Sequence, residues 1–421
     1  MSIQKTQDLT KIDVLRRVAL VSAMLLSGGW FLFPRIPLIL ILLGICIVLI
    51  KARNKIHRGI IPVLALISVV LFVQTIWPNQ SGISQFAIRL ANFLGAALLL
   101  NVYLCEGRDT LSKDLYPILK WMAIQSVVTC VLANTMNPLF VTIDFFGPNT
   151  RSFLLVLIYH FRSYALDSDD GFIRPSGFFW EPGIFQIYLN VYFYLALFVF
   201  KSWRQSSLGL LAVLSTWSTT GAMICVALIC IKFAWVFGTM RRSKVILAVV
   251  VGIVLTPVLG AYMYRNAADK FSGADAGSYV ARLTDLKAGV DIFTDHPLFG
   301  IGFAPTDYAR ALKKAGYPVY FVDQEKTMLR TTTNGVVMLL VCTGILLSIP
   351  FVVGLFTSRL FPHPKIVGGL LFVALLSEPI FFTPFPMLVI FGGFSHLAEE
   401  LRCSLQRMRP RVAIPSSADG M

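Results

Sequence analysis

The sequence predicts an all-α integral membrane protein that crosses the membrane about twelve times. Hydrophobic residues make up 56% of the 421 residues, charged residues make up only 14%, and the mean hydropathy is +0.72. Soluble globular proteins average about 45–50% apolar and about 25% charged residues, so this composition argues against a soluble enzyme. The apolar residues form unbroken runs, which disfavours the alternating strands of a membrane β-barrel.

The apolar runs follow one another along the chain, and many end beside Lys or Arg residues. The first run leads directly into a second, so we expect a retained first helix and not a cleaved signal peptide. The expected spanning helices cover residues 18–33, 36–50, 60–77, 83–104, 118–136 and 182–200, two short helices within 208–237, then 245–264, 333–357 and two helices within 366–398.

The distribution of Lys and Arg orients these helices. Cytoplasmic loops collect basic residues, and basic clusters at 51–58 and 241–244 mark the cytoplasmic side. Alternation then puts both chain ends in the cytoplasm, with a tail at 402–421. The whole chain is expected to be one polytopic domain with two sizeable periplasmic loops, 137–180 and 265–330. The net charge of +15 therefore indicates topology, and nucleic-acid binding is not expected because no soluble basic domain is present.

Residues 171–185, in the first loop, combine an arginine, a turn and a helix start. Pro175 favours an extended conformation at Arg174, and Pro182 suits the first turn of a helix that enters the membrane. The free N–H groups of that helix end and the guanidinium of Arg174 could together bind phosphate oxygens. The alternative is that Arg174 and Glu181 only pair with each other at the membrane interface.

The second loop contains an amphipathic helix that we expect to lie on the outer membrane face, with Arg282 off its apolar stripe. Pro297 ends this helix, and Gly300 and Gly302 make a turn. The alternative is a solvated face on which Arg282 pairs with Asp285. The apolar stripe consists of Leu283, Leu286, Val290 and Phe293.

Polar residues at membrane depth are costly and are therefore functional candidates. Arg89 and Asn334 lie near the outer surface, level with the two loops. Glu378, directly before Pro379, marks a broken helix. Lys232 is close to the cytoplasmic end of its helix, where its ammonium can extend to the interface.

The two loop segments resemble the motifs of the O-antigen polymerase and ligase superfamily, which are Wzy-type, GT-C-like membrane glycosyltransferases. The first motif is matched by R-P-S-G-F-F-W-E-P, which begins at Arg174. The second is matched by Arg282, fifteen residues ahead of P-L-F-G-I-G at 297–302. The resemblance runs from about Arg174 to Leu347, and the first third of the chain shows only generic membrane helices.

The resemblance implies a polymerase of bacterial surface polysaccharide, either O-antigen or exopolysaccharide, in the bacterial inner membrane. Such an enzyme transfers a glycan from undecaprenyl pyrophosphate to a lipid-linked repeat unit at the periplasmic face. Arg174 and Arg282 would stabilise the departing pyrophosphate, and Glu181 is the third catalytic candidate. No metal and no cofactor are expected. The acceptor base is left open between Glu181, Asp285, Asp291 and His296.

Four further residues are candidates for substrate binding in the outer cavity: Arg89, His296, Arg330 and Asn334. The expected partners are the undecaprenyl-pyrophosphate-linked oligosaccharide and membrane lipid. A chain-length regulator would be a third partner, and the sequence does not identify one. Asp167, Asp169 and Asp170 form only a weak D-x-D pattern, for which we do not expect a metal.

Two alternative functions stay open. Ligases of this superfamily carry a histidine–asparagine pair where the second loop enters the next helix, whereas this chain has Thr333 and Asn334 there. Because threonine cannot act as a base near neutral pH, this difference favours a polymerase over a ligase. A flippase for the same lipid-linked glycan would need polar residues through the depth of the membrane. The polar residues gather on one face instead, which favours an enzyme.

Overall fold

The computed structural model is mostly helical, and its helices follow the apolar runs of the sequence. It describes residues 2–29, 34–76, 83–107, 109–143, 150–160, 173–237, 264, 276–323, 326–329 and 332–408. The helices are α1 Ser2–Gly28, α2 Arg35–Arg53, α3 Ile60–Ile76, α4 Ile83–Glu106, α5 Thr110–Thr135, α6 Pro182–Tyr194, α7 Trp203–Ser215, α8 Thr219–Phe237, α10 Ala276–Asp295, α11 Pro305–Lys314, α12 Gly335–Thr357, α13 Pro364–Leu375 and α14 Pro384–Met408. The strands are β1 Val141–Ile143, β2 Thr150–Phe153, β3 Leu157–His160, β4 Tyr320–Asp323 and β5 Lys326–Leu329.

Among the described residues, 6 helices are long and apolar enough to cross a membrane, and two shorter apolar helices accompany them. This confirms a mostly helical, multi-pass membrane protein. The runs 208–237 and 366–398 each contain two helices, as the sequence predicted. The total of about twelve spans stays a prediction, because nearly all of the expected span at 245–264 lies outside the described residues.

Buried ion pairs join four helices at one end of the bundle. Arg16 of α1 donates from Nε to Asp114 of α5 at 2.5 Å, and its guanidinium also lies 3.1 Å from Glu106 at the end of α4. Glu106 pairs in addition with Arg53, at the end of α2. Removing one partner of such a buried pair leaves an uncompensated charge, which typically costs about 3–5 kcal/mol. These contacts bring together the helix ends that the basic residues predict to be cytoplasmic.

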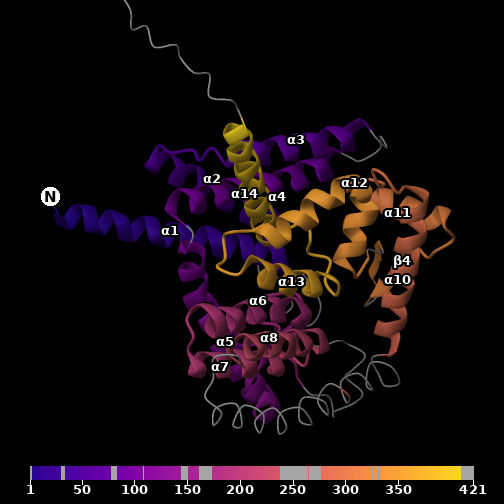
Figure 1. Cartoon of the computed structure of the whole chain (residues 1–421). Helices are drawn as coiled ribbons and strands as arrows, with labels where there is room; N and C mark the ends of the chain where they lie inside the picture. The colour runs from indigo at the N-terminus through magenta and orange to yellow at the C-terminus, as the bar shows by residue number, and fades with distance from the viewer. Residues whose placement is uncertain are drawn as a thin grey trace, which may run out of the picture.

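The opposite end of the bundle is where α1 ends and where α6 and α14 begin (Figure 1). The carbonyl of Gly28 accepts a hydrogen bond from the Trp180 N–H at 3.2 Å. The hydroxyl of Ser27 accepts one from the Phe385 N–H at 2.8 Å. We call this end, which the sequence predicts to be periplasmic, the outer end.

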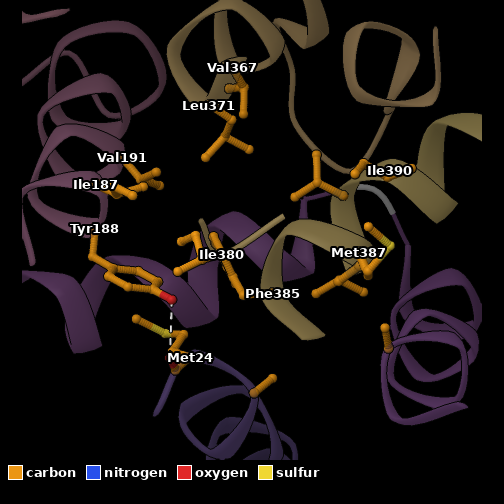
Figure 2. Packing of buried hydrophobic residues seen from close by; sticks show 14 of the residues in the cluster. Met24, Ile187, Tyr188, Val191, Val367, Leu371, Ile380, Phe385, Met387 and Ile390 are labelled. Carbon is orange, nitrogen blue, oxygen red and sulfur yellow. Dashed lines mark hydrogen bonds between the residues drawn. The ribbon is translucent and has the colours of Figure 1, made fainter. Parts of the chain in front are cut away.

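The core between α1, α6, α13 and α14 is apolar (Figure 2). The hydroxyl of Tyr188 on α6 donates to the backbone oxygen of Met24 on α1 at 3.1 Å. Phe179 stacks on the ring of Tyr188, with centroids 4.6 Å apart. This packing fixes the start of α6, and with it Glu181, relative to α1.

Two small antiparallel sheets, which the sequence did not predict, lie within the predicted loops. β1, β2 and β3 form a three-stranded sheet in the first loop, and β4 and β5 form a hairpin in the second. The strands have only three or four residues each, which is too short for a clear alternating pattern. α14 continues to Met408 and so includes the first residues of the expected tail at 402–421.

α12 is broken at Gly344, whose φ of +64° and ψ of −179° are not helical. The break leaves backbone groups without partners inside the helix, and the 297–302 turn binds them. These hydrogen bonds join Ile301 N–H to Val341 O (2.9 Å), Gly302 N–H to Cys342 O (3.1 Å), Ile345 N–H to Pro297 O (2.8 Å) and Leu346 N–H to Leu298 O (3.3 Å).

α10 runs beside the first half of α12 and, in Figure 1, lies crosswise to α1 and α3. Its Ala288 and Ile292 are buried against Val337, and a Cβ atom at Gly289 would collide with that valine. The helix expected in the second loop is therefore present. Three residues of its predicted apolar stripe face away from this contact and are exposed: Leu283, Leu286 and Val290. Such a stripe suits contact with lipid, and its position on a membrane stays a prediction.

Candidate active site

Arg174 is held at the outer end by the turn between α7 and α8. Its Nε donates to the backbone oxygen of Thr216 at 3.0 Å, and the side chain is half-buried. Pro175 pairs with Tyr159 as an isolated antiparallel bridge, so the backbone here is extended, as the proline predicted. The first-loop sheet and the α7–α8 turn thus fix the arginine from two sides.

Glu181 occupies the cap position of α6, with extended backbone angles of φ −141° and ψ 149°. Pro182 follows as the first helical residue, which confirms the predicted helix start. The carboxylate of Glu181 does not cap the helix, and Glu181 forms no ion pair with any residue that the structure describes, Arg174 included. The alternative of an Arg174–Glu181 pair is therefore not found. The Glu181 side chain is half-buried beside the N-terminus of α6.

Glu378 lies between α6, which follows the first predicted motif, and α12, which follows the second. It lies in the non-helical segment between α13 and α14 and is 4% exposed. A Cβ atom on Gly183, in the first turn of α6, would collide with its carboxylate. A Cβ atom on Gly335, the first residue of α12, would lie 2.6 Å from its backbone oxygen. Two helix beginnings therefore meet at Glu378, and a negative charge beside the start of α6 is favoured by the helix dipole.

The start of α12 is also tied to α10. The carboxylate of Asp285 accepts a hydrogen bond from the Thr333 N–H at 3.1 Å, and Asp285 is 3% exposed. Asn334 caps α12, since its side-chain oxygen accepts from the N–H groups of Val336 and Val337, both at 3.0 Å. Asn334 thus has a structural role in addition to the proposed role in binding. Arg282 lies about one turn before Asp285, and its side chain is exposed.

Arg89 faces an aromatic group at the outer end. Its guanidinium carbon lies 5.9 Å from the ring centre of Phe382, which belongs to the same non-helical segment as Glu378. Phe382 in turn packs edge-on against Phe303, which follows the 297–302 turn, with centroids 4.8 Å apart. Arg89 therefore contacts the segment that joins the two motifs.

The remaining predicted site residues lie apart from the place where α6 and α12 begin beside Glu378, which we call the junction, or they lie outside the described residues. His296 follows the end of α10, and at 1.5 Å per residue it stands about 20 Å along the helix from Arg282. Asp291 accepts a hydrogen bond from the Tyr317 hydroxyl at 2.5 Å, and this bond raises the pKa of Tyr317. Arg330 lies outside the described residues.

Sequence reasoning singled out Glu378 as the mark of a broken helix but did not include it in the site. Its neighbour Pro379 signalled the break, whereas its position between α6 and α12 depends on packing that no local pattern encodes. Within the described ranges, no group of three or more His, Cys, Asp or Glu side chains could hold a metal ion. The weak D-x-D pattern, Asp167, Asp169 and Asp170, lies outside those ranges.

Residues 206–352 match the family model described as O-antigen ligase. The match extends from α7 through α10 and the 297–302 turn into α12, so it contains Arg282 and Asn334. The resemblance to the O-antigen polymerase and ligase superfamily is thereby confirmed over these residues, and it supports a role connected with surface polysaccharide. No curated protein and no solved structure matches the chain significantly.

Proposed function

We propose that this chain is a polymerase of a bacterial surface polysaccharide. The observation that carries the proposal is the meeting of the two motif-bearing segments at one end of the bundle. The helix that follows Arg174 and the helix that is tied to Asp285 both begin against Glu378. The candidate site residues Arg89, Glu181 and Asp285 lie at the outer end together with Glu378, which suits an enzyme that works at a membrane surface better than a transporter.

The reaction is a glycosyl transfer at an anomeric carbon. The sugar hydroxyl of the acceptor attacks that carbon, the bond to the pyrophosphate oxygen breaks, and undecaprenyl pyrophosphate departs with the electron pair. The hydroxyl proton passes to a base, for which Glu181 and Asp285 are the candidates nearest the junction. Negative charge grows on the departing pyrophosphate, and Arg174 and Arg282 would stabilise it through charge-assisted hydrogen bonds.

The donor is activated by its pyrophosphate leaving group, so the reaction needs no nucleotide. This suits an active site on the periplasmic side of the inner membrane, where nucleotide sugars are not expected. Arg89 and Asn334 lie at the same end and would line the path of the glycan or the pyrophosphate. The undecaprenyl chain would lie between membrane-spanning helices.

A ligase is the second candidate, because the matched family model is itself described as O-antigen ligase. The position of the expected ligase histidine is Thr333, whose backbone N–H is bound by Asp285. A threonine hydroxyl neither carries charge nor acts as a base near neutral pH, whereas histidine does both. This difference favours the polymerase.

The glycan phenotype of a deletion strain separates the two functions. Without a polymerase, cells attach single repeat units or accumulate single lipid-linked repeats. Without a ligase, cells accumulate long lipid-linked chains that never reach the acceptor. Long lipid-linked chains in the deletion strain would overturn the polymerase assignment while keeping the glycosyl-transfer chemistry.

A further inference from the structure

The end of the bundle opposite the candidate active site carries a cluster of four hydrogen-bond donors. We call Lys201, Lys232, Trp235 and His363 the His363 cluster. Lys232 and Trp235 belong to α8, Lys201 precedes α7, and His363 precedes α13. The rings of Trp235 and His363 are 5.1 Å apart, and both pack edge-on against Phe198 at 5.4 Å and 5.9 Å. The Lys232 ammonium lies 5.3 Å from the Phe198 ring centre.

The two lysines of the cluster have no carboxylate partner among the described residues. They act instead on each other and on His363 as like charges. Burial, and then the charges of Lys232 and Lys201, hold the pKa of His363 below its usual value of 6.5. Two like charges without a carboxylate partner among the described residues repel each other, and an anion bound between them would relieve that repulsion.

The cluster is rich in hydrogen-bond donors. The Tyr194 hydroxyl lies 3.2 Å from Nδ1 of His363. In the tautomer of His363 that is protonated at Nε2, Nδ1 accepts from Tyr194 and Nε2–H is the donor that the ring offers. The Trp235 indole and the lysine ammonium groups donate and cannot accept. A ligand that suits them has acceptor oxygens only, as a phosphodiester does.

The local backbone is typical of a functional site, and the nearby tryptophans indicate that this site lies at the height of lipid headgroups. A π-helical turn at Leu195–Val199 precedes Lys201, which adopts a left-handed φ of +53°. Both features cost free energy and recur at functional sites. Trp235 and the neighbouring Trp203 are 52% and 74% exposed, and exposed tryptophans at helix ends mark the height of lipid headgroups.

We propose that the His363 cluster binds the phosphate of an anionic phospholipid from the leaflet at this end of the bundle. The phosphodiester oxygens accept from Lys201, Lys232 and Nε2 of His363, and the acyl chains run along the apolar surface of α8. Basic pockets between membrane helices on the cytoplasmic side are typical sites for such headgroups. The bound phosphate removes the repulsion within the cluster and ties α6, α8 and α13 together.

The test compares lipid retention and melting temperature for the full-length protein purified in a neutral detergent. Phosphatidylglycerol is titrated against phosphatidylcholine, and bound lipid is counted by native mass spectrometry. The cluster variant is Lys201→Gln with Lys232→Gln. The matched control is Lys51→Gln with Lys55→Gln, which removes two exposed lysines from the same end of the bundle.

We expect wild type and the control to retain phosphatidylglycerol over phosphatidylcholine and to melt at a higher temperature when it is added. The cluster variant loses this retention by roughly tenfold, because each nearby lysine contributes to the attraction. Without anionic lipid, the cluster variant melts at the same temperature as wild type or above it, since repulsion has been removed. That result also shows that the variant is folded.

Three results would overturn the proposal. The first is equal retention of phosphatidylglycerol by wild type and the cluster variant. The second is equal retention of phosphatidylglycerol and phosphatidylcholine by wild type. The third is a rise in melting temperature with inorganic phosphate that equals the rise with phosphatidylglycerol, because the occupant would then be a free anion and not a lipid.

Discussion

Gly300 and Gly344 lie where two backbones cross, and neither position leaves room for a side chain. A Cβ atom on Gly300 would lie 2.5 Å from the backbone of α12, at Val341 and Cys342. A Cβ atom on Gly344 would collide with the backbone of Leu298 and Phe299. The second glycine of the P-L-F-G-I-G motif, Gly302, donates to the carbonyl that the break exposes at Cys342. The motif therefore has a structural role: it fixes α10 to the broken helix that follows.

Alanine at either crossing glycine should destabilise the protein strongly. Both positions combine a positive φ with a backbone collision, so we expect a cost above the roughly 1–2 kcal/mol of a left-handed alanine alone. The matched control is Gly316→Ala, where φ is +78° but no atom lies within 4 Å. Melting temperature in detergent is the measurement. If Gly300→Ala melted no lower than Gly316→Ala, the crossing would not be tight.

Gly183→Ala should displace the Glu378 carboxylate while the overall fold is kept. The new methyl group meets the end of a side chain and not a backbone, so we expect a loss of about 1–3 kcal/mol or a displaced carboxylate, with reduced activity. Adding Glu378→Ala removes the obstacle, so the stability cost of Gly183→Ala should disappear in the double variant. Gly369→Ala, which has open space around it, is the control. Additive costs in the double variant would show that Gly183 and Glu378 do not touch.

Arg174→Ala and Arg282→Ala should each lower transfer by about a hundredfold or more while expression stays normal, because each removes a fixed charge from the departing pyrophosphate. Lysine should restore little activity, since it lacks the forked guanidinium. Arg310→Ala removes another exposed arginine, on α11, and serves as the control. Polymer length on gels is the measurement. Normal polymer with both alanine variants would show these arginines to be structural.

His363 should make the protein less stable in mild acid. Its pKa is lowered in the folded state, so the unfolded chain takes up a proton first as the pH falls through 6.5. The stability that depends on a neutral ring is therefore present above pH 6.5 and is lost below it. Without added lipid, the melting temperature of wild type should fall more between about pH 7.5 and about pH 5.5 than that of His363→Gln. Parallel curves for the two proteins would contradict this account.

Labelling of introduced cysteines should separate the two ends of the bundle. Leu155→Cys in the first loop and Ala315→Cys in the second are exposed and should react with an impermeant reagent in intact spheroplasts. Asn54→Cys should react only after the membrane is opened. The exposed native thiol of Cys403, near the C-terminus, should also react only after the membrane is opened. Labelling of Ala315→Cys from the cytoplasmic side alone would contradict the whole orientation.

The sequence predicted the helices because apolar runs and Lys/Arg positions directly reflect a membrane environment. It predicted the start of α6 because Pro182 carries a local preference. The break at Gly344 could not be predicted, since the apolar run continues through it and the 297–302 turn supplies the missing hydrogen bonds from far away in sequence. The position of Glu378 between α6 and α12 is likewise a property of packing, whereas its unusual charge at membrane depth was visible.

The most direct test of the central claim is chain growth by the purified protein. The protein is reconstituted in liposomes with undecaprenyl-pyrophosphate-linked repeat units in the presence of EDTA, and the products are separated by length. We predict a ladder of lengthened lipid-linked glycans that is lost in Arg282→Ala and kept in Arg310→Ala. The absence of any chain growth by wild type, with glycan transferred only to an added lipid A core, would contradict the polymerase assignment.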